Sequence, residues 1–126
     1  MRFWAAATAV LALPAFAADD PALYPAAQCA ALWFGQDDYA HASRLMKPDP
    51  GDLVMAEAFR TVALRLTTVG PEAIDAFITK QRRLMGFMID DYISGDDQSQ
   101  DLYQSLMQDC DAFAATQPET QNLRQK

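Results

Sequence analysis

The chain has 126 residues, 51% of them hydrophobic, and carries 10 lysines and arginines against 17 aspartates and glutamates, for a formal net charge of −7. This length accommodates one domain, and the hydrophobic share is too high for a disordered chain. The negative charge argues against a nucleic-acid-binding protein, which needs a basic face.

The first 17 residues have the three-part pattern of a secretory signal peptide. Met1 and Arg2 give a positive start, an apolar run follows over residues 3–13, and the small residues Ala15 and Ala17 mark a cleavage site. The run is shorter than the roughly 20 residues that span a bilayer. The pattern predicts export to the periplasm and no membrane insertion of the mature chain; an uncleaved anchor and a buried helix are the alternatives.

Two cysteines follow the predicted signal peptide, Cys29 near its end and Cys110 near the end of the chain. Paired thiols in an exported protein usually form a disulfide, and these two lack the C-x-x-C spacing of redox pairs. We therefore predict a structural Cys29–Cys110 disulfide. Two free thiols or a redox or metal role are the alternatives.

Apolar residues recur at intervals of three and four, which predicts helices throughout the mature chain. The first helix is expected over residues 21–44. Gly35 lies inside it and precedes Gln36 and two aspartates, so the sequence leaves open whether this helix is continuous or broken at Gly35.

The second helix is expected from Pro50 to Val69, with Asp49 as its N-cap. Its apolar stripe consists of Met55, Phe59, Val62, Leu66 and Val69. The third helix is expected over residues 72–93, and the short connection through Gly70 predicts that it lies antiparallel beside the second. Its stripe consists of Ile74, Phe77, Ile78, Leu84, Met85, Met88 and Tyr92.

The fourth helix is expected over residues 96–116, with Cys110 on its buried stripe, where a disulfide to the first helix requires it. The fold class is therefore all-α, a small four-helix bundle whose first and last helices are joined by the disulfide. The domain is expected to cover residues 18–118, followed by a flexible tail over residues 119–126.

No pattern predicts a catalytic site, a cofactor or a dedicated metal site. The aspartates around the third turn lack calcium-loop spacing, so a solvated acidic turn is the simpler interpretation and a cation site the alternative. They are Asp90, Asp91, Asp96, Asp97 and Asp101. Met85 and Met88 have copper-binding chemistry but fall on the apolar stripe, where methionine is ordinary core filling. His41 is expected at the surface or at a helix end.

The one basic cluster, Lys80, Arg82 and Arg83, flanks the apolar stripe of the third helix. Ion pairing with nearby carboxylates would explain it structurally, whereas an anion or protein partner would explain it functionally. Trp33 is a core residue or an aromatic anchor for a partner.

These patterns predict a non-enzymatic exported protein that binds a periplasmic protein partner through Lys80, Arg82, Arg83 and Trp33. The alternative is a carrier of a small ligand or metal that uses the bundle interior or the aspartate-rich turn.

Overall fold

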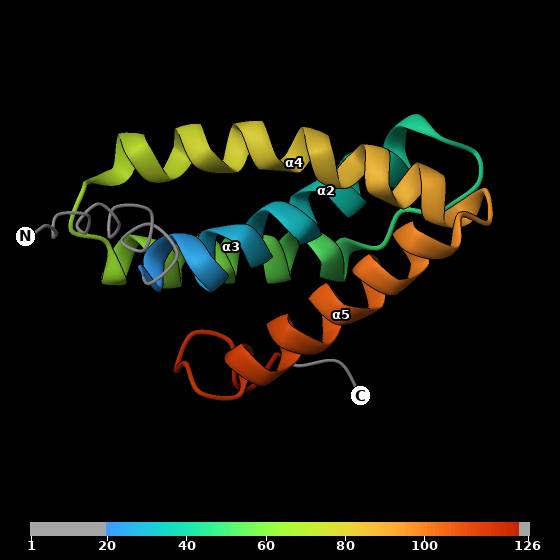
Figure 1. Ribbon diagram of the computed structural model, residues 1–126. Helices are drawn as coiled ribbons and strands as arrows, with labels where there is room; N and C mark the ends of the chain where they lie inside the picture. Colours follow the sequence, from blue (N-terminus) through green and yellow to red (C-terminus); the bar gives the residue numbers. More distant parts are fainter. Residues whose placement is uncertain (1–19, 124–126) are drawn as a thin grey trace, which may run out of the picture.

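The computed structural model describes residues 20–123, so the predicted signal peptide lies outside the described residues. Within that range the chain is helical and contains no strand (Figure 1). A short π-helical segment, η1 (Ala22–Ala27), is followed by the helices α2 (Gln28–Ala42), α3 (Pro50–Leu66), α4 (Pro71–Ile93) and α5 (Asp97–Ala114). The predicted all-α fold class is confirmed.

The predicted first helix is continuous through Gly35 and is instead irregular near its beginning. Tyr24 has extended backbone angles, φ −127° and ψ 107°, and precedes Pro25. A residue before proline is disfavoured in the helical region, because the proline ring clashes with it. The regular helix α2 therefore starts only after η1, and it ends at Ala42.

Helix starts follow the capping residues that the sequence offers. The Asp49 carboxylate accepts a hydrogen bond of 2.8 Å from the Gly51 amide at the start of α3. Asp96 accepts one of 2.8 Å from the Ser99 amide at the start of α5. Such side-chain acceptors satisfy amides that have no partner within the helix.

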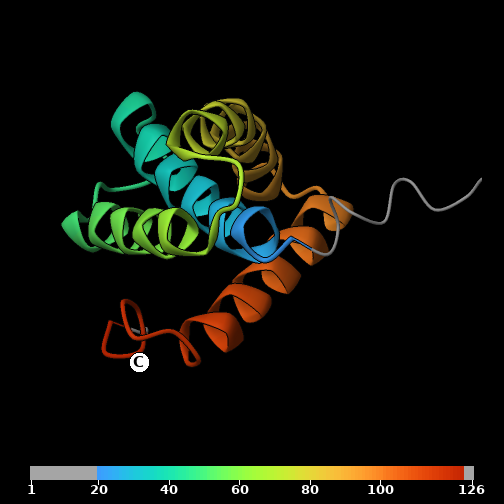
Figure 2. The same cartoon turned by 90° about the vertical axis from the view of Figure 1, so that its left-hand side faces the viewer.

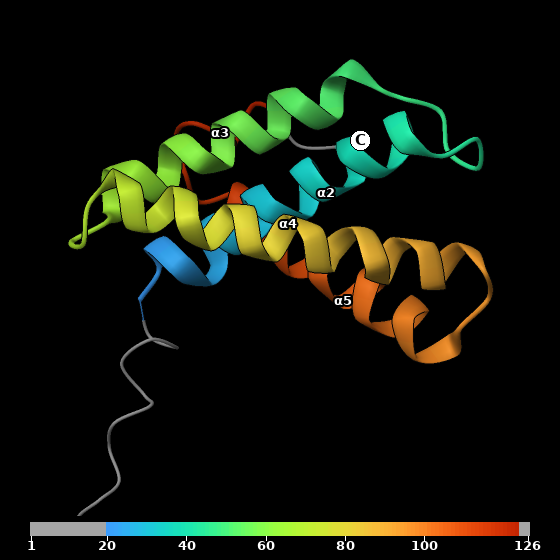
Figure 3. The same ribbon diagram turned by 90° about the horizontal axis from the view of Figure 1, so that it is seen from above.

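Helix α2 lies at the centre of the molecule, between α3 and α4 (Figures 2 and 3). Every residue from Cys29 to Gly35 is buried, as expected for a helix that is apolar on all sides. Helices α3 and α4 run antiparallel as predicted. Each packs mainly on α2, and only a few residues of α3 and α4 contact each other directly.

The apolar face of α4 is turned relative to the predicted stripe. Ile74, Ile78, Met85, Met88 and Ile89 are buried. Leu84, which was expected in the core, is instead 50% exposed. The central position of α2 explains the difference, because α4 buries the side that faces α2 and α5.

The predicted disulfide is confirmed. Cys29 and Cys110 are bonded, with Cα atoms 5.6 Å apart, and join the beginning of α2 to the end of α5. A disulfide indicates an oxidising, exported environment.

The chain after α5 differs from the expected flexible tail as far as residue 123. Arg65 on α3 donates two hydrogen bonds, of 2.6 and 2.9 Å, to the carboxylate of Glu119. The Thr120 side chain is fully buried and donates a hydrogen bond of 2.8 Å to the carbonyl oxygen of Ala114. The segment is therefore tied to the helices by polar contacts that sequence spacing does not reveal.

Candidate functional site

The three residues of the basic cluster have different surroundings. Arg82 points to α2, where its Nε and Nη2 atoms donate hydrogen bonds of 2.8 Å to the two carboxylate oxygens of Asp38. Its guanidinium carbon lies 4.4 Å from the centre of the Phe34 ring. Lys80 and Arg83 are exposed and have no ion pair within residues 20–123.

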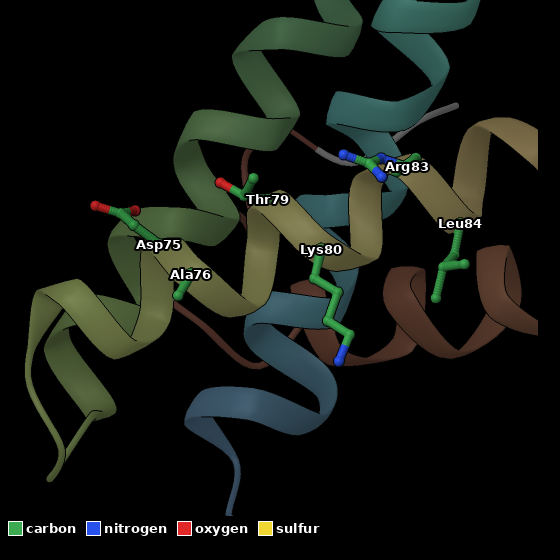
Figure 4. A pocket seen from close by; sticks show the side chains of 6 residues that line it. All are labelled: Asp75, Ala76, Thr79, Lys80, Arg83 and Leu84. Atoms are coloured by element: carbon green, nitrogen blue, oxygen red, sulfur yellow. The ribbon is translucent and has the colours of Figure 1, made fainter.

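The outer side of α4 carries an open hollow of about 610 Å³ (Figure 4). Six residues of α4 line it: Asp75, Ala76, Thr79, Lys80, Arg83 and Leu84. Figure 4 shows the side chains of Lys80 and Leu84 extending from the same side of the helix. The Asp75 carboxylate accepts two hydrogen bonds from Arg60, of 2.7 and 2.9 Å. Lys80 and Arg83 therefore carry the charges of the hollow that have no ion pair among residues 20–123.

Trp33 is not part of this surface. Its side chain is buried between the helices, with 5% of its area exposed. The indole Nε1 atom is buried and has no hydrogen-bond partner among the residues that the structure describes. A buried N–H group without an acceptor costs about 1–3 kcal/mol, so this atom calls for an explanation.

Trp33 lines a partly open cavity of about 170 Å³ between α2, α3 and α5. The remaining lining residues are Met55, Phe59, Met107, Cys110 and Asp111. The wall is thus formed by two thioethers, two aromatic rings and the disulfide, with one carboxylate. This composition is typical of a ligand site, an apolar pocket with few polar groups.

A partly buried polar network lies one helical turn from the cavity. Gln36 donates a hydrogen bond of 3.2 Å to the Asp52 carboxylate and accepts one from the Tyr103 hydroxyl. Gln36 follows Trp33 by three residues, Asp52 precedes Met55 by three, and Tyr103 precedes Met107 by four. These spacings place each network residue on the same helix face as a cavity residue.

Burial shifts both ionisable groups of the network towards their neutral forms. It raises the pKa of the Asp52 carboxyl above its usual value of 3.8, and the hydrogen bond from Gln36 offsets part of that rise. Burial, with repulsion from Tyr92 and Asp52, raises the pKa of Tyr103 to about 12. The network therefore holds a hydroxyl that stays protonated at neutral pH.

Two residues of the aspartate-rich turn form hydrogen bonds within the protein. Asp96 caps α5, and Asp90 accepts a hydrogen bond of 2.9 Å from the Tyr39 hydroxyl. No group of three or more His, Cys, Asp or Glu side chains placed to hold a metal ion occurs in residues 20–123.

The remaining candidate site residues from the sequence lie in the core or at a helix end. Met85 and Met88 are buried in the core. His41 is exposed at the end of α2, with Nδ1 2.9 Å from the carbonyl oxygen of Asp37. It borders an open hollow of about 700 Å³ that also contains the exposed side chains of Leu53 and Val54.

The sequence does not predict the cavity as a site, although several of its residues stand out there. The sequence predicts Trp33 as a core residue or an anchor, and Met55 and Phe59 as members of an apolar stripe. Met107 was not singled out, yet it lies four residues after Tyr103 and three before Cys110, which is the spacing of that helix face. No local spacing could show that these three helices leave a cavity.

Comparisons of the chain with models of protein families, with curated proteins and with solved structures find no match. Among residues 20–123, no helix is long and apolar enough to cross a membrane.

Proposed function

We propose that this protein is an exported, non-enzymatic binding protein, and that the cavity beside Trp33 binds a small aromatic molecule with a hydrogen-bond acceptor. The observation that carries the proposal is the buried Trp33 indole, whose Nε1 lacks a partner within residues 20–123 in a side chain that lines a cavity. A bound acceptor would remove the cost of that unpaired donor.

The size of the cavity favours a ligand built around one ring. An apolar protein cavity of about 150 Å³ binds benzene, and the cavity beside Trp33 has about 170 Å³. The thioethers of Met55 and Met107 favour an aromatic ligand in particular, because sulfur–aromatic contacts are stabilising by about 0.3–1.5 kcal/mol.

The polar network supports binding rather than catalysis. Asp52 and Tyr103 both hydrogen-bond to Gln36, so their polar atoms are engaged with one another. Catalysis would instead need such groups to converge on a substrate. Their role in this proposal is to fix the three helices that form the cavity.

Export to the periplasm forms part of the proposal. The signal-peptide pattern of residues 1–17 and the Cys29–Cys110 disulfide support it together, since disulfides persist in oxidising compartments. The binding protein would then meet its ligand outside the cytoplasm.

The test follows the indole N–H resonance of Trp33 by NMR, since Trp33 is the only tryptophan within residues 20–123. The ¹⁵N-labelled mature protein is titrated with acetophenone and, in parallel, with isopropylbenzene, which has the same ring and branching but no acceptor. Acetophenone should move the indole N–H resonance downfield to saturation. Isopropylbenzene should bind about 5- to 10-fold more weakly, because one hydrogen bond is missing.

The variant Trp33→Phe keeps an aromatic side chain but removes the donor. It should bind both molecules with the lower affinity of isopropylbenzene. If neither molecule perturbs the Trp33 resonance, the cavity does not bind ligands of this class. If both bind equally well to the wild type, the unpaired indole is not part of the binding site.

A protein partner on α4 is the second candidate function. Two large apolar side chains, Leu84 and Phe87, are 50% and 63% exposed there, beside the unpaired cation of Lys80. With Arg82 bonded to Asp38 and Trp33 in the interior, the predicted partner-binding residues reduce to Lys80 and Arg83. Loss of partner capture in Leu84→Ala, with ligand binding retained, would test this candidate separately.

A further inference from the structure

The exposed side of α4 carries a stripe of four residues, Lys80, Leu84, Phe87 and Asp91. Their separations of four, three and four residues place them on one face of the helix. All four are exposed, and the two apolar side chains lie in the middle of the stripe. Adjacent exposed apolar side chains with charged flanks are typical of a docking surface.

The two ends of the stripe have opposite charges. Neither the Lys80 ammonium nor the Asp91 carboxylate forms an ion pair within the described part of the chain. Arg60, Arg65 and Arg82, in contrast, each bind a carboxylate with two hydrogen bonds. The stripe therefore has one free charge of each sign at a fixed separation of eleven residues.

We propose that a second copy of this chain docks on the stripe, with the two α4 helices antiparallel. Reversing the direction of the stripe exchanges its ends, so Lys80 of each copy faces Asp91 of the other. The same register places each Leu84 against the other copy's Phe87. A two-fold axis between the helices satisfies both relations at once, as an isologous dimer requires. This inference rests on the proposal that α4 docks a protein.

The opposite charges at the two ends of the stripe favour a second copy as the occupant. Two chains of net charge −7 repel each other, so association needs local attraction, and the antiparallel register supplies two Lys80–Asp91 pairs. The contact along the stripe is about 16 Å long at 1.5 Å per residue. Interfaces this small give weak, reversible association.

The test uses charge reversal on each side of the proposed pair, measured by sedimentation equilibrium and native mass spectrometry on the full mature chain. Lys80→Glu alone places two carboxylates opposite each other at both ends, and Asp91→Lys alone places two ammonium groups there. Each variant should be monomeric at concentrations where the wild type dimerises. An equimolar mixture should form the mixed dimer, because the introduced Glu then faces the introduced Lys at one end and the unchanged Asp91 faces the unchanged Lys80 at the other.

Two controls separate this result from unfolding or from a general charge effect. Circular dichroism should be unchanged in both variants, since the substituted residues are exposed. Asp101→Lys makes the same change of charge as Asp91→Lys, but at an exposed position of α5, and should leave the dimer intact. A wild type that stays monomeric at all concentrations overturns the proposal, as does a mixture that fails to restore the dimer. Neither result would alter acetophenone binding, and a protein other than a second copy would then occupy α4.

Discussion

Gly35 on α2 packs directly against Met85 on α4, and a Cβ atom at Gly35 would lie 2.7 Å from the Cβ atom of Met85. The same added atom would lie 2.8 Å from the carbonyl oxygen of Arg82. Both neighbours belong to the rigid part of α4 and cannot rotate away. The absence of a side chain at position 35 therefore sets how closely the two helices approach.

Gly35→Ala should destabilise the protein by about 1–3 kcal/mol, the usual cost of overpacking a core. This cost exceeds the gain in helix propensity of roughly 1 kcal/mol that alanine brings. Urea unfolding measures the difference. Gly86→Ala is the matched control, since no atom lies within 4 Å of its added Cβ; it should stabilise α4 by about 0.5–1 kcal/mol. Equal effects of the two substitutions would contradict the close approach of α2 and α4.

Gly35 also shows which parts of this fold could be predicted from the sequence. Local signals were sufficient for the helical class and for the Asp49 cap, and the exported context predicted the Cys29–Cys110 pairing. Gly35 could break its helix or allow a neighbouring helix to pack closely against it. Which of the two occurs depends on α4, which lies about fifty residues further along the chain. Sequence spacing around Gly35 contains no information about that neighbour.

The same limit applies to the apolar faces and to the candidate site. The exposed Leu84 and the buried Ile89 both fit helical spacing. Which of the two side chains is buried depends on the central position of α2. The cavity depends on Trp33, Met55 and Met107, which come from three different helices. Each residue is an ordinary core residue within its own helix, and the site exists only where the three meet.

Arg82 and Arg83 are neighbours in sequence, but alanine substitutions at the two positions should affect stability by different amounts. Arg82→Ala removes the two hydrogen bonds to Asp38 and the contact with the Phe34 ring. Partly exposed ion pairs contribute about 0.2–1 kcal/mol and exposed cation–π contacts about 0.5–1 kcal/mol. We therefore expect a loss of about 1 kcal/mol for Arg82→Ala and a change within about 0.5 kcal/mol for Arg83→Ala.

Thermal unfolding resolves this contrast, because 1 kcal/mol shifts Tm by roughly 4–8 °C in a domain of this size. A double-mutant cycle with Asp38→Asn assigns the loss to the pair. Should Arg83→Ala prove as destabilising as Arg82→Ala, the stability effect would not come from the Asp38 contact.

Reduction of the disulfide should lower the free energy of unfolding by about 2–5 kcal/mol. The bond joins residues 81 positions apart, and cross-linking a loop of that length restricts the unfolded chain strongly in the chain-entropy model. Urea unfolding with and without a phosphine reductant measures the loss. The double variant Cys29→Ala, Cys110→Ala should unfold at the same urea concentration in both conditions. Equal stability of the oxidised and reduced wild type would show that the bond is not a major source of stability.

Asp52 should make the protein less stable as the pH rises above about 4. Its folded-state pKa is raised above 3.8 by burial, so the folded protein retains this proton at a pH where the unfolded chain has lost it. The stabilisation by protonated Asp52 is complete below 3.8 and disappears as the pH passes the raised folded-state pKa. Asp52→Asn lacks this titration, so the variant should gain stability relative to the wild type from pH 3.8 upwards.

Asp96→Asn is the control with the opposite sign. The hydrogen bonds from Ser99 lower the pKa of Asp96 in the folded protein, so the ionised carboxylate stabilises the fold above 3.8 and this contribution is lost as the pH falls through the lowered value. The wild type should therefore gain stability relative to Asp96→Asn as the pH rises towards 3.8, and lose stability relative to Asp52→Asn as the pH rises further above 3.8. Urea unfolding of all three proteins in steps from acid to neutral pH measures both slopes. Parallel slopes for the two variants would mean that Asp52 is not desolvated, and that the network of Asp52, Gln36 and Tyr103 beside the cavity is open to water.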